Sequence, residues 1–237
     1  MDREQQSNRF EGLARHTPAR IGVGRTGTRP LTKELLKLRL DHAHAVDSVY
    51  GEVHAATLDE FNLFSVNTRF GDKENYLKRP DRGRLLADEA AIEITERCVH
   101  KPQVQIVVSD GLSAKAVDEN LPDILPALID SLAFNKLACG TSFFVRGGRV
   151  GCMDDIGRLL APEVLVLLIG ERPGLAAAAS MSAYMCYQPR PGKKDSDRMV
   201  ISNIHQRGTP PVEAGAHIGS ILRKMIEQRI SGVNLII

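Results

Sequence analysis

Two short polar segments stand directly behind apolar runs, and their side chains are the first candidates for ligand chemistry. The segment SDG over residues 109–111 follows VQIVV, and GERPG over residues 170–174 follows LVLLI. The carboxylates of Asp110 and Glu171 are hydrogen-bond acceptors. The competing interpretation is that both segments are ordinary turns with solvated side chains, and composition alone leaves that choice open.

A glycine-rich segment is a second candidate for binding chemistry. The stretch from Gly22 to Gly27 matches G-x-G-x-x-G, which resembles a dinucleotide fingerprint. A working fingerprint needs a preceding strand and a surrounding βαβ unit. Here a polar, proline-containing segment precedes it and a mainly helical region follows. The favoured interpretation is a structural or subunit-contact loop.

Motifs for self-contained catalysis are missing from the sequence. Neither H-E-x-x-H nor G-x-S-x-G occurs, and His42 and His44 lie two apart, so they do not share a helical face. The four cysteines form no C-x-x-C pair and sit among apolar residues, as buried thiols do. The sequence therefore predicts no catalytic residue and no metal ligand in this chain, only binding loops.

The elements that position these loops follow an α/β pattern. The chain has 237 residues, of which 43% are hydrophobic and 25% charged, as in an average soluble globular protein. Strands alternate with helices after residue 102, and two strands are apolar throughout, which predicts a mostly parallel sheet with helices on both faces. The predicted strands lie within residues 104–117, 141–150, 163–170 and 182–188, and the helices at 121–135, 154–161 and 209–230.

The sheet pattern gives the two polar loops a common location. In open parallel sheets, ligands bind beyond the carboxyl ends of the strands. Residues 109–111 and 170–174 are therefore expected along the same edge of one sheet. Thr209 and Pro210 predict the start of the last helix, as N-cap and first helical residue.

The chain divides into three predicted regions. Residues 1–20 are polar and expected to form a flexible tail, residues 21–100 are mainly helical, and residues 101–237 form the α/β domain. Residues 57–80 fit no element well. The net charge of +2 is too balanced to indicate a nucleic acid or membrane partner, and no secretory signal or membrane span is evident, so a cytoplasmic location is expected.

Several long blocks closely resemble the small (light) subunit family of ethanolamine ammonia-lyase. They occur in the same order as in the family and cover the chain from about residue 20 to its end. The blocks are TGTRPLTKELL, NYLKRPDRGRLL, VVSDGLSAKAV, FFVRGGRV, LIGERPGL and ISNIHQRGTPPVEAGAHI.

The resemblance implies both a fold and an activity. The family enzyme uses adenosylcobalamin to convert ethanolamine to acetaldehyde and ammonia in ethanolamine catabolism. Its large subunit is a barrel that carries the radical chemistry. Its small subunit is a Rossmann-like α/β domain after a helical N-terminal part, is not itself catalytic, and closes over the cobalamin between the chains. The assembly contains three dimers of large–small pairs. The chain lacks D-x-H-x-x-G, so the resemblance implies a cobalamin that keeps its own lower base.

Three cobalamin-contacting positions carry over from the family. They are Val150 after the FFVR strand, Glu171 of GERPGL, and Val200 just before ISNIH. Many relatives have cysteine at the position of Val200, so an apolar or backbone contact is retained there and a thiol role is lost. Asp110 and Arg172 are expected as neighbours along the same edge.

The sequence leaves alternatives open for both the cellular location and the function of the chain. Some family members carry a longer N-terminal extension that directs them into bacterial microcompartments, and here only about 20 residues precede the matching region, so encapsulated and free cytoplasmic complexes both remain open. The alternative functions are a nucleotide-binding Rossmann-type oxidoreductase and a stand-alone cobalamin-binding module.

Overall fold

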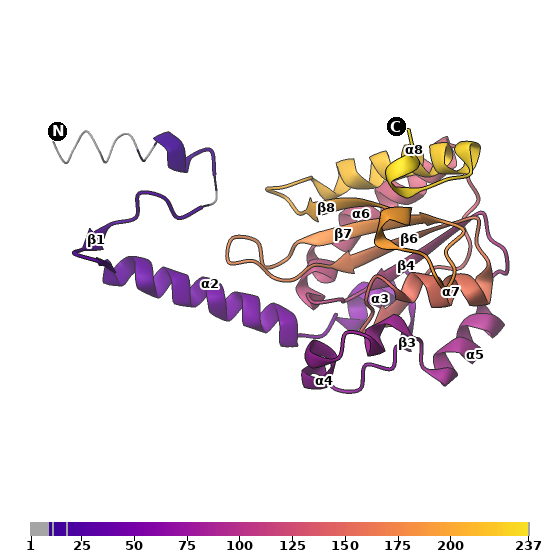
Figure 1. Cartoon of the computed structure of the whole chain (residues 1–237), viewed down its shortest axis with the longest axis horizontal. Helices are drawn as coiled ribbons and strands as arrows, with labels where there is room; N and C mark the ends of the chain where they lie inside the picture. Colours follow the sequence, from indigo (N-terminus) through magenta and orange to yellow (C-terminus); the bar gives the residue numbers. More distant parts are fainter. Residues whose placement is uncertain (1–9, 11, 18, 237) are drawn as a thin grey trace.

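The computed structural model describes residues 10, 12–17 and 19–236, and its centre is a six-stranded sheet (Figure 1). The strand order is β3-β5-β4-β6-β7-β8. The first four strands pair in parallel, whereas β7 runs antiparallel to both of its neighbours. The predicted α/β class with a mostly parallel sheet is confirmed. The strands are β3 (Phe64–Asn67), β4 (Val104–Ser109), β5 (Phe143–Arg146), β6 (Val164–Gly170), β7 (Met181–Tyr187) and β8 (Arg198–Ile204).

Helices cover both faces of the sheet. α6 (Ala114–Phe134) and α8 (Pro211–Gln228) pack against one another and contribute to one hydrophobic core. α5 (Asp88–Arg97) and α7 (Cys152–Leu160) contribute to a second core on the other face. Because both faces of the sheet are buried, the β6 side chains that point to either face are apolar. Val164, Val166 and Leu168 enter the first core, and Leu165, Leu167 and Ile169 the second.

The ends of most strands lie at one edge of the sheet. Since β7 is antiparallel to β6 and β8 is antiparallel to β7, β8 runs in the same direction as β6. The ends of β3, β5, β4, β6 and β8 therefore meet the start of β7 at one edge, which we call the carboxyl edge. The sequence did not predict β3 or β8.

The N-terminal part is mainly helical, as predicted, although β3 from this part joins the sheet. α2 extends away from the sheet, and only its C-terminal end approaches the α/β domain (Figure 1). A small antiparallel hairpin precedes it. The elements are β1 (Arg25–Thr26), β2 (Arg29–Pro30), α2 (Thr32–Tyr50), α3 (Ala55–Glu60), α4 (Lys73–Lys78) and η1 (Arg82–Arg84); two further short 3-10 helices are η2 (Asp195–Asp197) and η3 (Gly232–Asn234).

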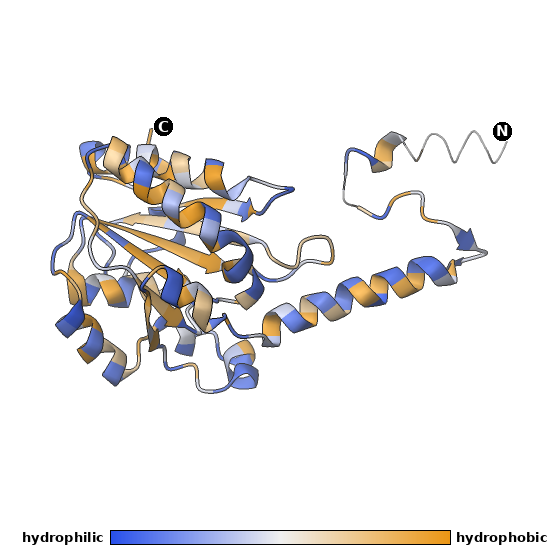
Figure 2. Cartoon of the chain, turned by 180° about the vertical axis from the view of Figure 1, so that it is seen from behind, coloured by the Kyte–Doolittle hydropathy of each residue, from blue (hydrophilic) through white to orange (hydrophobic). Residues whose placement is uncertain are grey.

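Apolar side chains remain uncovered along α2. Leu36 is 58% exposed and Leu40, one turn later, is 57% exposed. Figure 2 shows apolar residues interspersed with polar ones over the whole length of this helix. α2 therefore presents an apolar stripe that the described residues leave exposed.

The predicted boundaries have different outcomes. The expected flexible tail at 1–20 falls largely on residues outside the described ones, and the division into regions 21–100 and 101–237 stays a prediction. The predicted start of the last helix is wrong: Pro210 is the N-cap and the helix begins at Pro211. Thr209 is held instead by backbone hydrogen bonds to Asn203 and His205 beside β8.

The four cysteines are unpaired thiols. Cys98, Cys152 and Cys186 are buried in the second core, and Cys139 is exposed. Burial raises the pKa of Cys152 to about 12 and that of Cys98 to about 11. Among the described helices, none has the length and apolar character needed to cross a membrane.

Candidate functional site

The two polar loops lie side by side at the carboxyl edge, as the sequence predicted. β4 and β6 are neighbours in register, with Ser109 opposite Ile169 at their ends. The Leu112 N–H donates to the carbonyl oxygen of Gly170 at 3.0 Å. Gly111 has a φ of +50°, and a Cβ there would overlap the Gly170 carbonyl oxygen. The close approach of the loops therefore requires glycine at position 111.

Asp110 is buried in the first of these loops, with 6% of its surface exposed. Its Oδ1 accepts hydrogen bonds from the Gly147 N–H at 2.8 Å and the Ser109 hydroxyl at 3.4 Å. Its Oδ2 lies 3.8 Å from Lys73 Nζ. Burial raises the pKa of Asp110, and the Lys73 cation opposes that shift. Asp110 thus anchors the loop that follows β5.

Both carboxylate oxygens of Glu171 are hydrogen-bonded within the chain. Oε2 accepts from the Ser180 hydroxyl at 2.6 Å, and Oε1 accepts from the Ser182 hydroxyl at 2.5 Å and the Asn203 N–H at 2.9 Å. The half-buried side chain therefore connects the end of β6 to β7 and β8. The interpretation of Glu171 as a freely solvated turn residue is wrong. A carboxylate has about four acceptor positions, so one is left for a ligand.

The loop after β5 carries Val150, and buried Tyr76 fixes that loop. The Tyr76 hydroxyl lies 2.9 Å from the Gly111 carbonyl oxygen and 2.8 Å from that of Gly148, and its single proton is shared between them. Burial raises the pKa of Tyr76, which keeps this donor protonated. The Arg149 guanidinium packs 4.2 Å from the centre of the Tyr76 ring.

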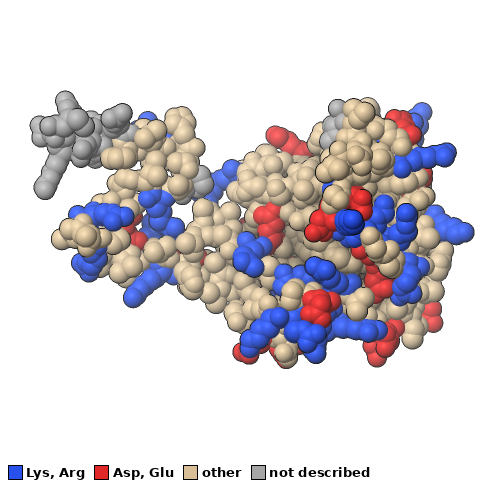
Figure 3. Space-filling model, viewed as in Figure 1, with Lys and Arg blue, Asp and Glu red and all other residues tan. Residues whose placement is uncertain are grey.

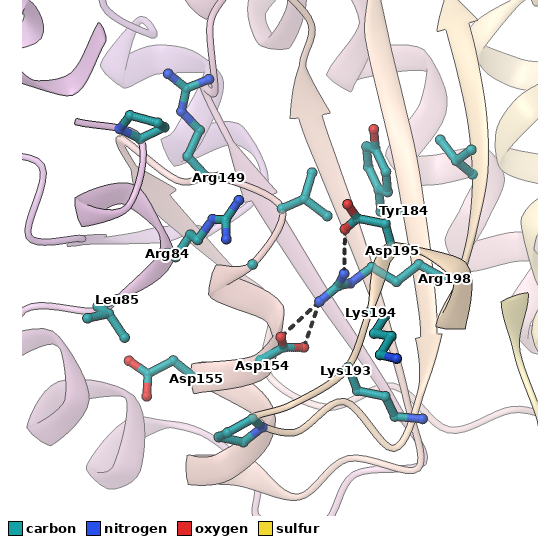
Figure 4. Close-up of a pocket in the computed structure, with 15 residues that line it drawn as sticks. Arg84, Leu85, Arg149, Asp154, Asp155, Tyr184, Lys193, Lys194, Asp195 and Arg198 are labelled. Carbon is teal, nitrogen blue, oxygen red and sulfur yellow. Dashed lines mark hydrogen bonds and ion pairs between the residues drawn. The ribbon is translucent and has the colours of Figure 1, made fainter. Parts of the chain in front are cut away.

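The predicted residues line one connected surface beside this loop. A cavity of about 920 Å³, drawn in Figure 4, is lined by both Val150 and Val200. A hollow of about 280 Å³ is lined by Val150 and Glu171. Arg149, Val150 and Tyr184 line both. The structure therefore brings Val150, Glu171 and Val200 together. Val200 is 48% exposed, while the next residue, Ile201, packs against the core.

The larger of these two cavities, called the main cavity below, is strongly charged. Arg198 is buried at its base and donates to both carboxylate oxygens of Asp154, at 3.0 and 2.8 Å, and to Asp195 at 2.8 Å. Burial raises the pKa of Asp154, and the Arg198 cation opposes that shift. Figure 4 shows this ion-pair cluster between Lys193 and Lys194 on one side and Arg84 on the other. Lys and Arg also gather over this part of the surface in Figure 3.

Sequence reasoning missed several residues of this surface. Tyr76, Arg149, Tyr184 and Arg198 come from segments that adjoin only in the folded chain. One signal was available, because Arg149 directly precedes the predicted Val150. Among residues 10, 12–17 and 19–236, no group of three or more His, Cys, Asp or Glu side chains is arranged to hold a metal ion.

The family comparison matches almost the whole of this fold. The model of the family described as ethanolamine ammonia-lyase light chain (EutC) matches residues 7–236. The chain belongs to the ethanolamine ammonia-lyase light-chain family. This confirms the resemblance on which Val150, Glu171 and Val200 were chosen.

Curated members of the light-chain family are similar over most of their length. A relative from Fusobacterium nucleatum is 47% identical over 226 residues, which are 95% of this chain and 77% of the relative. One from Clostridium tetani is 46% identical over 99% of this chain and 80% of the relative. One from Lachnoclostridium phytofermentans is 41% identical over 99% of this chain and 79% of the relative. All three are named ethanolamine ammonia-lyase small subunit.

The glycine-rich segment of this light-chain member is not a dinucleotide loop. Arg25–Thr26 and Arg29–Pro30 pair as a short antiparallel hairpin, and Gly27 turns between them with a φ of +60°. A dinucleotide fingerprint requires a parallel βαβ unit around it. Here the segment leads into α2 instead.

Proposed function

We propose that this chain is the small subunit of an adenosylcobalamin-dependent ethanolamine ammonia-lyase. In this proposal it is the non-catalytic, cofactor-contacting subunit of a carbon–nitrogen lyase that acts in ethanolamine catabolism. Membership of the light-chain family supports the enzyme assignment. The observation that carries the cofactor role is the connected surface on which Val150, Glu171 and Val200 meet.

The residues of this surface fit cobalamin chemically. A corrin ring has broad apolar faces, amide arms at its rim and a nucleotide tail. Val150 and Val200 offer apolar contact, and Glu171 has one acceptor position for an amide or hydroxyl donor. The Nε atoms of Arg149 and Arg198 are buried without a hydrogen-bond partner among the described residues. Such donors suit a ligand rich in carbonyl and phosphate oxygens.

The role of this chain is to bind and orient the cofactor. When bound, adenosylcobalamin supplies the radical chemistry, and the protein contributes position and shielding. Asp110 and Tyr76 fix the loops at the carboxyl edge, and Glu171 joins three strands beneath the surface. These contacts stiffen the surface before a ligand arrives, which reduces the entropic cost of binding.

A large subunit is the proposed partner. The relatives are named small subunits, and a cofactor held between two chains needs a second surface over the cavity. The apolar stripe on α2 is proposed as part of the contact with that large subunit, since it is exposed in this chain. The arrangement as three dimers of large–small pairs, and the choice between a microcompartment and the free cytoplasm, stay predictions.

Reconstitution tests the proposed function. The purified chain should not deaminate ethanolamine, and neither should the large subunit alone. Mixing the two with adenosylcobalamin should produce acetaldehyde and ammonia. Deamination of ethanolamine by this chain alone would contradict the proposal. Cobalamin binding to this chain without any effect of the large subunit would favour the stand-alone cobalamin module, and saturable NAD binding would favour the oxidoreductase.

A further inference from the structure

Four cations of the main cavity have no carboxylate partner among the residues that the structure describes. The cavity is lined by five Lys or Arg side chains and three carboxylates. Two of the carboxylates, Asp154 and Asp195, pair with Arg198. The third, Asp155, accepts from Arg158 at 2.8 Å and from the Leu86 N–H at 2.9 Å. The cations left without an acidic partner among the described residues are Arg84, Arg149, Lys193 and Lys194.

The two arginines of this group are held in place by the fold. The Arg149 guanidinium lies over the Tyr76 ring, and its backbone N–H donates to the Gly83 carbonyl oxygen at 2.8 Å. Arg84 directly follows Gly83, and its stem lies against Gly151, where a Cβ would come within 3.0 Å of Arg84 Cγ. Two guanidinium groups are therefore positioned beside Val150.

The two lysines approach from the opposite side of the cavity, on the loop between β7 and β8. Asp197 anchors this loop, because its carboxylate accepts from the Lys194 N–H at 2.7 Å. Lys193 is half-buried, and its charge lies close enough to oppose the rise that burial causes in the pKa of Asp154. In Figure 4 both lysines lie across the Arg198 ion pairs from Arg84 and Arg149. Cations thus bracket the cavity from two separate elements.

We infer that Arg84, Arg149, Lys193 and Lys194 form a binding site for a phosphate group. Guanidinium groups bind phosphate through paired hydrogen bonds, and lysine adds a compact positive charge. The site rests on the proposed function for its ligand. Val150, Val200 and Leu85 line the same cavity, so an anion attached to an apolar body fits better than an isolated ion. The phosphodiester in the nucleotide tail of cobalamin has that chemistry.

The test compares two corrinoids that differ in the phosphodiester. Cyanocobalamin carries the nucleotide tail, and cobinamide has the same corrin ring without it. Both are titrated spectroscopically into the complex of this chain with the large subunit. The double variant Lys193→Ala/Lys194→Ala should weaken cyanocobalamin about ten- to a hundredfold, the range for one or two lost charge-assisted hydrogen bonds. Cobinamide affinity should change less than about twofold, because cobinamide has no phosphodiester and so has no lysine–phosphate hydrogen bonds to lose.

Two control variants separate charge recognition from other effects. Lys136→Ala/Lys224→Ala removes the same net charge from residues outside the cavity lining and should leave both affinities unchanged. Lys193→Arg/Lys194→Arg keeps the charges and should retain most of the cyanocobalamin affinity. Melting temperatures of all variants report whether each complex remains folded.

A further arm distinguishes the tail from free phosphate. Inorganic phosphate is titrated calorimetrically into the corrinoid-free complex and its lysine variants. Lysine-dependent phosphate binding, with the affinity of neither corrinoid weakened by the lysine variant, supports the site with a free anion as its ligand. Equal weakening of both corrinoids, or no effect of the lysines in either arm, overturns the inference. Failure of the wild-type complex to bind any corrinoid contradicts the proposed function instead, and the phosphate arm remains readable.

Discussion

Glu171 shows how one side chain can serve both the sheet and a ligand surface. Its carboxylate accepts hydrogen bonds from two serine hydroxyls and one backbone N–H of neighbouring segments. The same side chain borders the hollow next to Val150. Any ligand bound through its remaining acceptor position is thereby connected to three strands.

Changing Glu171→Gln should therefore affect stability and affinity together. The amide removes the charge and replaces one acceptor oxygen with a donor that faces a hydroxyl. Hydrogen bonds to charged groups contribute about 1.5–3 kcal/mol, so the free energy of unfolding and the cobalamin affinity should both fall, the latter by about ten- to a hundredfold. Urea denaturation and corrinoid titration measure the two effects. Glu163→Gln, at the opposite end of the β6 segment, is the matched control and should change neither.

Asp110 predicts a pH dependence of stability. Its pKa in the folded chain is raised above the ordinary value of 3.8, so folding favours the protonated carboxyl. The stability that this proton contributes is complete below about pH 3.8 and is lost as the pH rises through the folded-state pKa. Asp110→Asn does not titrate. The unfolding free energy of the wild type minus that of the variant should therefore decrease with rising pH, and an increase would contradict this account.

At the scale of elements, α4 stabilises loops that belong to other parts of the chain. Through Tyr76, this six-residue helix reaches Gly111 behind β4 and Gly148 behind β5. A short helix has little stability of its own, so its packing matters more than its helix propensity. We regard α4 and the two loops as one folded unit at the carboxyl edge.

Tyr76→Phe tests that unit. The substitution keeps the ring beneath Arg149 and removes the hydroxyl that reaches both the Gly111 and the Gly148 carbonyl oxygens. Leaving a buried acceptor unpaired costs about 1–3 kcal/mol, which should appear as a lower free energy of unfolding in urea. Corrinoid affinity of the complex should fall as the loop with Val150 loosens. Tyr50→Phe on α2, where the tyrosine is 55% exposed, should leave both quantities unchanged.

The sequence could predict some elements and not others, for physical reasons. β6 was evident because two-sided burial makes VLVLLI apolar throughout. β8 was not evident, because RMVISNI is buried at its two ends and partly buried or exposed in between, so it shows neither a continuous apolar run nor a clean alternation. β3 has four residues, too few for a periodic signal.

The candidate site was predictable only in part for a similar reason. Val150, Glu171 and Val200 came from family resemblance, and the shared edge of the two polar loops came from the strand pattern. The contacts that hold these residues in place could not be predicted from the sequence. Glu171 with Asn203, and Tyr76 with Gly148, are pairs that lie far apart in the sequence. No local pattern encodes such pairs.

At the scale of the whole molecule, α2 projects beyond the domain with its apolar stripe uncovered (Figure 2). Leu36→Glu with Leu40→Glu should leave the melting temperature of the isolated chain nearly unchanged, since exposed substitutions usually shift stability by less than about 0.5 kcal/mol. Assembly with the large subunit, followed by size-exclusion chromatography, should be lost. Phe134→Glu, at an 88% exposed position on α6, is the control. Normal assembly of the α2 variant would exclude this helix from the interface.

The buried thiols of the second core can be used to measure how often the structure around them opens. Only the thiolate attacks alkylating reagents, and Cys152 is both enclosed and held as the thiol by a pKa of about 12. Alkylation of Cys152 must therefore wait for the chain to open around α7, next to Gly151 at the cavity wall. Its labelling rate, set against that of exposed Cys139, reports how often this wall opens. A ligand or partner that occupies the cavity in the assembled protein should slow the labelling of Cys152, and the slowing should be greater the more tightly it binds.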